Sequence, residues 1–256
     1  MENGNLNTLN KVAKITLYFW IMKVLATTLG EILGDFLSMS LNLGYIVGLG
    51  ITIVFFLVVL TLQLMAKRFN PILYWLVIIG TTTVGTEISD LMDRTLGLGY
   101  ALGSSILFAC LLLTLFLWHK KEKGIRVYPI TERSVEVFYW IAILFSNSLG
   151  TALGDFLSDN LGLSYLMGAL VTAVIIIVVV LVHYFTRINA VLLFWITFIF
   201  TRPFGATFGD FLTKPTENGG LNFSRGIAAL VTATLLGVVL YISTRMEKKG
   251  TPVVVN

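Results

Sequence analysis

The hydrophobic pattern divides the chain into eight apolar stretches, separated by short segments with charged residues, Gly, Asn and Pro. A helix needs about 20 residues to cross the hydrocarbon core of a bilayer, and each stretch is long enough. They lie near residues 15–38, 44–66, 71–92, 99–119, 135–157, 164–185, 189–212 and 224–244. The pattern therefore predicts an all-α polytopic membrane protein with eight transmembrane helices.

The composition agrees with this prediction. Hydrophobic residues make up 56% of the chain and charged residues 12%, and the mean hydropathy is +0.87. These values exclude a soluble globular protein of this length and make the lipid bilayer the first expected partner. No Pro/Ser linker or low-complexity tract marks a second domain, so we expect one transmembrane domain over residues 1–256.

Within the apolar sequence, one segment recurs four times. An aromatic pair ends in Trp, and Asp follows that Trp 15 residues later in every copy, as Trp20–Asp35, Trp75–Asp90, Trp140–Asp155 and Trp195–Asp210. The repeats cover about 15–66, 71–119, 135–185 and 189–244. Because each copy holds two spans, all four run the same way through the membrane. They are predicted to be two-helix hairpins around an axis along the membrane normal.

Small residues accompany each Asp. Copies one, three and four read Gly-x-x-x-Gly-Asp-Phe-Leu-Ser/Thr, whereas copy two has Ser89 in place of the second Gly. On these residues the chain resembles a family of uncharacterised bacterial membrane proteins built from four tandem repeats, each with two transmembrane regions and a characteristic Trp. The resemblance covers Trp20 to Tyr241 and implies location in a bacterial inner membrane. The Gly pairs themselves predict close helix packing.

Lysine and arginine residues predict the orientation. The segments between repeats and the two chain ends hold Lys11, Lys14, Lys67, Arg68, Lys120, Lys121, Lys123, Arg126, Arg133, Arg187, Arg245, Lys248 and Lys249. The opposite turns hold only Arg94, Lys214 and Arg225. The positive-inside rule then places both termini in the cytoplasm and the repeat Trp at the cytoplasmic interface. The pI near 9.2 follows from this topology and requires no nucleic-acid partner.

Carboxylates inside the spans are the strongest functional candidates, because an ionisable side chain in a membrane is costly. Six are predicted to bind substrate or ions: Glu31, Asp35, Glu87, Asp90, Asp155 and Asp210. At about 1.5 Å per helical residue, each repeat Asp lies about 22 Å from its Trp. Two bases within the spans are predicted to balance these charges, because Lys23 precedes Glu31 by eight residues and Arg202 precedes Asp210 by eight. A band of polar side chains, represented by Thr27, Thr82 and Asn147, is predicted to form a path below the acids.

The predicted site offers oxygen donors, which suit hard metal ions, and we expect Asp35, Asp90, Asp155 and Asp210 to be the metal ligands. Membrane carboxylates also relay protons. The sequence therefore predicts a secondary transporter of metal cations coupled to protons, without a cofactor and without enzymatic activity. Three alternatives stay open: a passive cation channel, an organic-cation exporter, and a structural membrane protein without transport.

Overall fold

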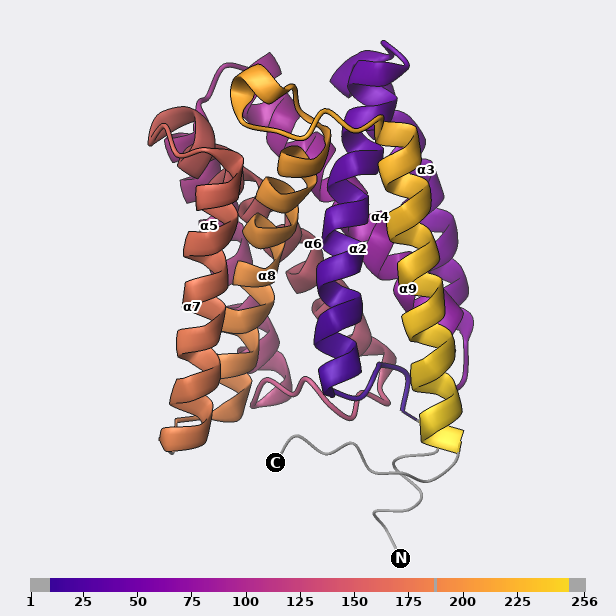
Figure 1. Ribbon diagram of the computed structural model, residues 1–256. Coiled ribbons are helices and arrows are strands. Elements are labelled where there is room, and N and C mark those ends of the chain that lie inside the picture. Colours follow the sequence, from indigo (N-terminus) through magenta and orange to yellow (C-terminus); the bar gives the residue numbers. More distant parts are fainter. Residues whose placement is uncertain (1–9, 187, 249–256) are drawn as a thin grey trace, which may run out of the picture.

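The computed structural model describes residues 10–186 and 188–248, which form a bundle of roughly aligned helices (Figure 1). The long helices of this part of the chain are α2 (Leu17–Asp35), α3 (Gly44–Met65), α4 (Pro71–Asp90), α5 (Tyr100–Glu122), α6 (Arg133–Asp155), α7 (Tyr165–Phe185), α8 (Ala190–Thr213) and α9 (Arg225–Lys248). Eight candidate membrane spans result, within a few residues of the predicted ones. Arg187 and Lys249, which the topology prediction uses, lie outside the described residues.

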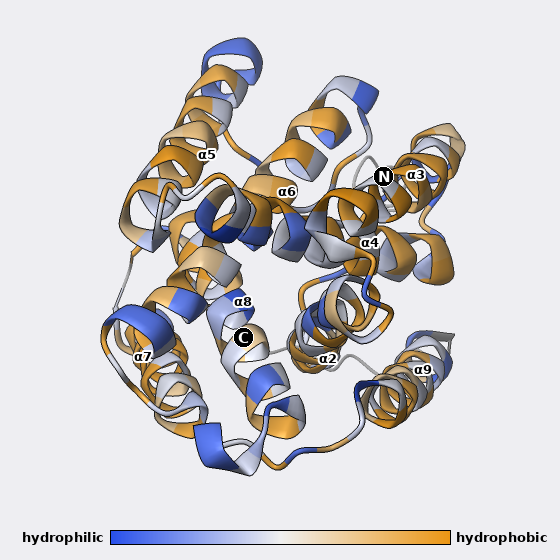
Figure 2. Ribbon diagram, turned by 90° about the horizontal axis from the view of Figure 1, so that it is seen from above, coloured by the Kyte–Doolittle hydropathy of each residue, from blue (hydrophilic) through white to orange (hydrophobic). Residues whose placement is uncertain are grey.

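The first helices of the four repeats form the inner ring. Helix α2 packs on α4, α4 on α6, α6 on α8, and α8 returns to α2. Seen from above, these four helices surround the centre, and α3, α5, α7 and α9 lie outside them (Figure 2). In the most apolar part of each span, 61–72% of the residues are buried in the inner helices, against 22–33% in the outer ones. The outer helices therefore present their apolar side chains to lipid.

Each outer helix packs mainly on the inner helix of the next repeat. Helix α3 covers α4, α5 covers α6, α7 covers α8, and α9 closes the circle on α2. The two helices of one repeat therefore pack less on each other than on the neighbouring repeats. Since every repeat holds its neighbour, the first and last repeats must meet for the bundle to be complete.

Glycines allow the inner helices to approach one another. The first Gly of each motif lies against the residue seven places after the Trp of a neighbouring copy, and a Cβ there would come within 3.0 Å of neighbouring atoms. The pairs are Gly30 with Thr82, Gly85 with Asn147, Gly150 with Arg202, and Gly205 with Thr27. This arrangement confirms that the Gly motif serves helix packing. It also carries the polar side chains of one helix to the backbone of the next.

The aromatic pairs fill the inner ring at the end where α2 begins, which we call the tryptophan end. The first aromatic ring of one copy packs on the Trp of the next copy, with ring centroids 5.3–5.7 Å apart. The pairs are Phe19 with Trp75, Tyr74 with Trp140, and Phe194 with Trp20. Because Trp75, Trp140 and Trp195 are at most 4% exposed, they belong to the protein interior. At the cytoplasmic interface where the sequence predicts them, these three Trp side chains would thus face other helices and not lipid headgroups.

The inner helices of repeats one to three end in a wide π-helical turn directly after the repeat Asp. These turns are η1 (Phe36–Ser40), η2 (Leu91–Thr95) and η3 (Phe156–Asn160). Repeat four differs, because α8 continues to Thr213 and a loop with the short 3₁₀ helix η4 (Thr216–Asn218) follows. Each π turn makes i→i+5 backbone hydrogen bonds, for example from the amide of Leu96 to the carbonyl of Leu91, at 2.8 Å. The turns place the residues that follow each Asp over the end of the ring.

Candidate functional site

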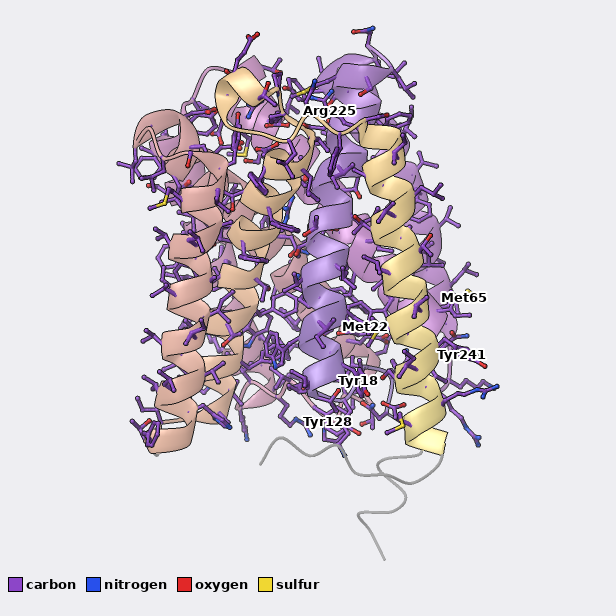
Figure 3. The ribbon with its side chains drawn as sticks, viewed as in Figure 1. Tyr18, Met22, Met65, Tyr128, Arg225 and Tyr241 are labelled. Atoms are coloured by element: carbon purple, nitrogen blue, oxygen red, sulfur yellow. The ribbon has the colours of Figure 1, made fainter. Side chains whose placement is uncertain are left out.

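All four repeat aspartates lie at the end of the inner ring opposite the tryptophan end, which we call the aspartate end. Each is only 2–4% exposed. Arg225, labelled at the upper end of the bundle in Figure 3, marks this level. The structure does not gather the four carboxylates into one set of ligands. It joins them into two pairs, and a basic residue bridges each pair.

The first pair consists of Asp90 on α4 and Asp155 on α6, bridged by Arg94 in η2. The Arg94 guanidinium lies 3.2 Å from Asp90 and 3.3 Å from Asp155. A third carboxylate, Asp159, lies 3.9 Å from the same guanidinium and accepts a 2.6 Å hydrogen bond from the hydroxyl of Tyr100. Three acids therefore surround one base in this cluster.

The second pair consists of Asp210 on α8 and Asp35 on α2, bridged by Lys214. The Lys214 ammonium lies 2.7 Å from Asp35 and 3.2 Å from Asp210. Arg225, the first residue of α9, adds a second base 3.5 Å from Asp35. Here two acids face two bases, so the two clusters differ in charge although the repeat makes them equivalent in position.

The contacts of Arg94, Lys214 and Arg225 with the aspartates were not predicted from the sequence, which indicates only that these bases lie in the turns opposite the chain ends. A local signal was present, because Arg94 and Lys214 each follow a repeat Asp by four residues, which is one helical turn. Copies one and three have Met39 and Asp159 at this position. A base therefore follows the repeat Asp only in every second copy. As a result, the four aspartates form two bridged pairs and not a single ring of four carboxylates.

Glu31 and Arg202 form a buried ion pair deeper in the bundle. A terminal nitrogen of Arg202 lies 2.8 Å from the carboxylate of Glu31, and the two side chains are 0% and 5% exposed. The hydroxyl of Thr86 donates to Glu31 at 3.2 Å and also contacts the guanidinium. The three residues come from α2, α8 and α4. Arg202 thus balances Glu31, and it does not pair with Asp210, the acid that its spacing suggested.

Lys23 points into the inner ring. Its ammonium donates a 2.8 Å hydrogen bond to the side-chain carbonyl of Asn147 and lies 3.9 Å above the ring of Phe198. The amide of Asn147 in turn donates to the hydroxyl of Thr81 at 2.9 Å. All four inner helices contribute one residue to this cluster. Among the described residues, no acid lies within ion-pair distance of Lys23, so the structure does not give it the charge-balancing contact that its spacing suggested.

The predicted polar path is used for helix contacts in this structure. Thr27 donates at 3.2 Å to the backbone carbonyl of Thr201, and Thr82 donates at 3.2 Å to that of Ala26. Both bonds cross from one inner helix to the next. Asn147 belongs to the Lys23 cluster. These side chains fasten neighbouring helices together, and their contacts do not form a continuous chain toward the aspartates.

Glu87 differs from the other five acids because it makes no ion pair and no side-chain hydrogen bond within the described residues. It is completely buried on α4, and the backbone of Gly48 on α3 lies against its carboxyl group. Within the described part of the chain, no three acidic, His or Cys side chains converge closely enough to hold a metal ion. A metal at the aspartate end would therefore require the bridging bases to move.

A further buried cluster lies at the tryptophan end and was not predicted. The ammonium of Lys11 pairs with Glu136 and donates to the backbone carbonyl of Leu64 at 3.1 Å. Gln63 donates to Glu136 at 3.1 Å and to the carbonyl of Lys11 at 2.9 Å. These bonds hold the segment before α2 against α3 and α6. Lys11 therefore serves internal packing in addition to any effect on orientation.

Lys214 gives the aspartate end a predictable response to pH. Burial disfavours its ammonium, but the carboxylates of Asp210 and Asp35 raise its pKa above the ordinary value. A group with a raised pKa in the folded state stabilises fully below its unfolded value, about 10.4 for Lys, and loses this effect as the pH rises through the folded value. We expect Lys214→Met to lower the thermal unfolding temperature by the same amount from about pH 6 to about pH 9. Melting curves in detergent, with the exposed Lys120→Met as control, test this. A difference that disappears near neutral pH would contradict it.

A family model described as a repeat of unknown function (DUF347) matches the chain four times, over residues 18–69, 73–123, 138–189 and 193–249. These segments coincide with the four inner–outer helix units of the structure. No curated protein and no solved structure matches the chain. The matched segments cover most of the sequence, and the chain therefore belongs to the family of membrane proteins built from the DUF347 repeat.

Proposed function

We propose that this protein is a secondary transporter of cations and that the aspartate end is its binding site. The observation that carries the proposal is the unequal charge of the two clusters. Asp90, Asp155 and Asp159 share one guanidinium, whereas Asp35 and Asp210 face two bases. Buried carboxylates in excess of their bases require protons or cations. The cluster around Arg94 therefore receives the cation.

In this proposal the bridging bases hold the site when it is empty. Arg94 is 29% exposed, so it can leave Asp155 for water while Asp90, one helical turn away, keeps it near the site. An incoming cation then replaces the guanidinium between Asp90 and Asp155. The second cluster stays neutral through Lys214 and Arg225, and it closes the other half of the ring. The inequality of the clusters favours a specialised transport site over a symmetric channel filter.

Hard metal ions are the first substrate class, because carboxylates and the hydroxyl of Tyr100 are oxygen donors. A second class is favoured by a specific observation. The two pairs already bind a guanidinium and an ammonium through ion pairs of 3.3 Å and 2.7 Å, and an organic cation would bring the same groups. We therefore propose primary amines and guanidinium compounds as the alternative substrates.

The orientation of the bundle in the membrane is also part of this proposal. The start of α2 and the end of α9 lie at one end of the bundle (Figure 1), and the basic residues of the sequence are concentrated in the termini and in the segments between repeats. We propose that this end faces the cytoplasm of a bacterial cell and that the aspartate end faces outward across the inner membrane.

A flux screen with purified protein in proteoliposomes tests the function. Mg²⁺, Mn²⁺, Ca²⁺, guanidinium and a primary amine are offered with and without a pH gradient. We expect uptake of one class, driven by the gradient and accompanied by proton movement in the opposite direction. Absence of flux for all five cations in both gradient directions would contradict the proposal. Saturating single-channel currents without proton coupling would support a passive channel instead.

A further inference from the structure

Glu87 is a buried acid whose polar atoms have no partner. It is 0% exposed, and neither carboxyl oxygen makes a hydrogen bond within the described residues. No base of this part of the chain lies within ion-pair distance of it. The other acids of the predicted site, by contrast, each contact at least one basic side chain. Glu87 therefore requires a separate explanation.

The carboxyl group lies in the contact between α4 and α3. A Cβ at Gly48 would lie 2.8 Å from one carboxyl oxygen of Glu87 and 3.1 Å from its carboxyl carbon. The equivalent contact in the last two repeats joins Gly168 on α7 to Thr207 on α8, with the methyl group of the threonine 3.0 Å from such a Cβ. The fold thus uses this position for close helix packing, and repeat two puts an acid where repeat four has a threonine.

The neighbours of Glu87 do not compensate a negative charge. The titratable groups on the elements packed against α4 near this level are Tyr45 on α3, Glu31 and Asp35 on α2, Asp155 on α6, Asp93 and Arg94 in η2, and Arg202 on α8. Most of them are acids, and Arg94 is already shared by Asp90 and Asp155. Arg202 contacts Thr86 of α4 but is already paired with Glu31. An ionised carboxylate in this buried contact would have no protein partner to compensate its charge, which is energetically unfavourable.

We propose that Glu87 is a proton-binding site in the contact between α3 and α4, and that its proton keeps these two helices together. With the proton bound, the neutral acid fits the apolar contact beside Gly48. When the proton leaves, the carboxylate draws water into the contact and α3 separates from α4. Since Glu87 precedes Asp90 by three residues on the same helix, this movement displaces the wall of the proposed cation site. The link to transport rests on the proposed function, but the protonation of Glu87 does not.

Infrared spectroscopy of the purified protein in lipid tests the protonation without any transport. At neutral pH we expect the wild-type spectrum to contain the carbonyl stretch of a protonated carboxylic acid at Glu87. This band should be absent from the spectrum of Glu87→Gln. Gly48→Ala should shift this band because the new methyl group meets the carboxyl, whereas Gly50→Ala, with open space around it, should leave the band unchanged. Thr207→Val changes the position in repeat four that corresponds to Glu87, and as a control it should also leave the band unchanged.

Identical spectra for the wild-type protein and Glu87→Gln would overturn the proposal. If Glu87→Gln fails to fold, an unchanged band in Gly48→Ala would overturn it equally. The coupling is tested separately in proteoliposomes, where Glu87→Gln should lose at least about tenfold in pH-driven uptake and keep uptake driven by the cation gradient. If no cation is transported at all, the proposed function fails while the infrared result still decides whether Glu87 holds a proton.

Discussion

Replacing Arg202 with leucine is expected to destabilise the folded protein by about 3–5 kcal/mol, the cost of removing one partner from a buried ion pair. The reason is that Glu31 would keep a buried charge without its base, since the Arg202–Glu31 contact of 2.8 Å is almost completely shielded from water. The guanidinium also binds the backbone carbonyl of Thr27 and the hydroxyl of Thr86. Its loss therefore removes the polar contacts of this side chain with α2 and α4. Unfolding of the variant in lipid or detergent, followed by denaturant titration, measures the change.

Two variants make this result specific. Arg126→Leu removes one partner of an exposed ion pair with Glu132, in which both side chains are 55% exposed, and should cost less than about 1 kcal/mol. The double variant Glu31→Leu with Arg202→Leu removes both buried charges and should be more stable than Arg202→Leu alone. If Arg202→Leu is as stable as Arg126→Leu, the buried pair does not hold the inner ring together.

Asp155→Asn and Asp210→Asn are each expected to abolish cation uptake while the protein remains folded. Asp155→Asn removes a carboxylate of the cluster that receives the cation. Asp210→Asn leaves Lys214 and Arg225 with only Asp35, so the second cluster becomes positive and repels the cation. Both changes preserve the size of the side chain. Loss of one partner from a buried charged contact is worth about 2–5 kcal/mol, and about 1.4 kcal/mol corresponds to a factor of ten. Uptake should therefore decrease by at least about 30-fold in proteoliposomes.

The structure offers a graded control for this prediction. Asp159 contacts the same guanidinium as Asp155, but at 3.9 Å and with a side chain that is 45% exposed. Water screens such a charge, so Asp159→Asn should reduce uptake only a few-fold. Gel filtration checks that all three variants remain folded. Normal flux in both Asp155→Asn and Asp210→Asn would remove the repeat carboxylates from the transport path.

The positions of the helices could be predicted because they depend on local hydrophobicity. A span must be apolar over about 20 residues wherever it lies in the bundle, so the eight stretches were visible in the sequence. The repeat Trp shows the limit of this reasoning. An aromatic residue near the end of a span is typical of the lipid interface, yet Trp140 packs on Tyr74 of the preceding copy because the inner ring is closed. Apolar residues do not reveal whether lipid or another helix covers them.

The partners of the candidate site could be predicted only in part. Arg94 and Asp90 lie one turn apart on the same segment, so this contact was accessible from spacing. The contact of the same guanidinium with Asp155 joins two different repeats and was not. Likewise, Arg202 precedes Asp210 by eight residues, which is about two helical turns and suggested that the two would pair. The guanidinium instead meets Glu31 on α2. Helical periodicity predicts the side of the helix on which a residue lies. It does not predict which other helix packs against that side.

Four properties could be predicted without the structure: the eight spans, the fourfold repeat, the packing role of its glycines, and an acid at the same level of each repeat's first helix. These properties follow from the backbone period and from the cost of polar groups in lipid. The tertiary structure decided which charges meet. It joined the aspartates in two unequal pairs, buried Lys23 beside Asn147 and left Glu87 alone against Gly48. The physical reason is that each repeat packs on its neighbour, so contacts between residues far apart in the chain exist only after the ring has closed.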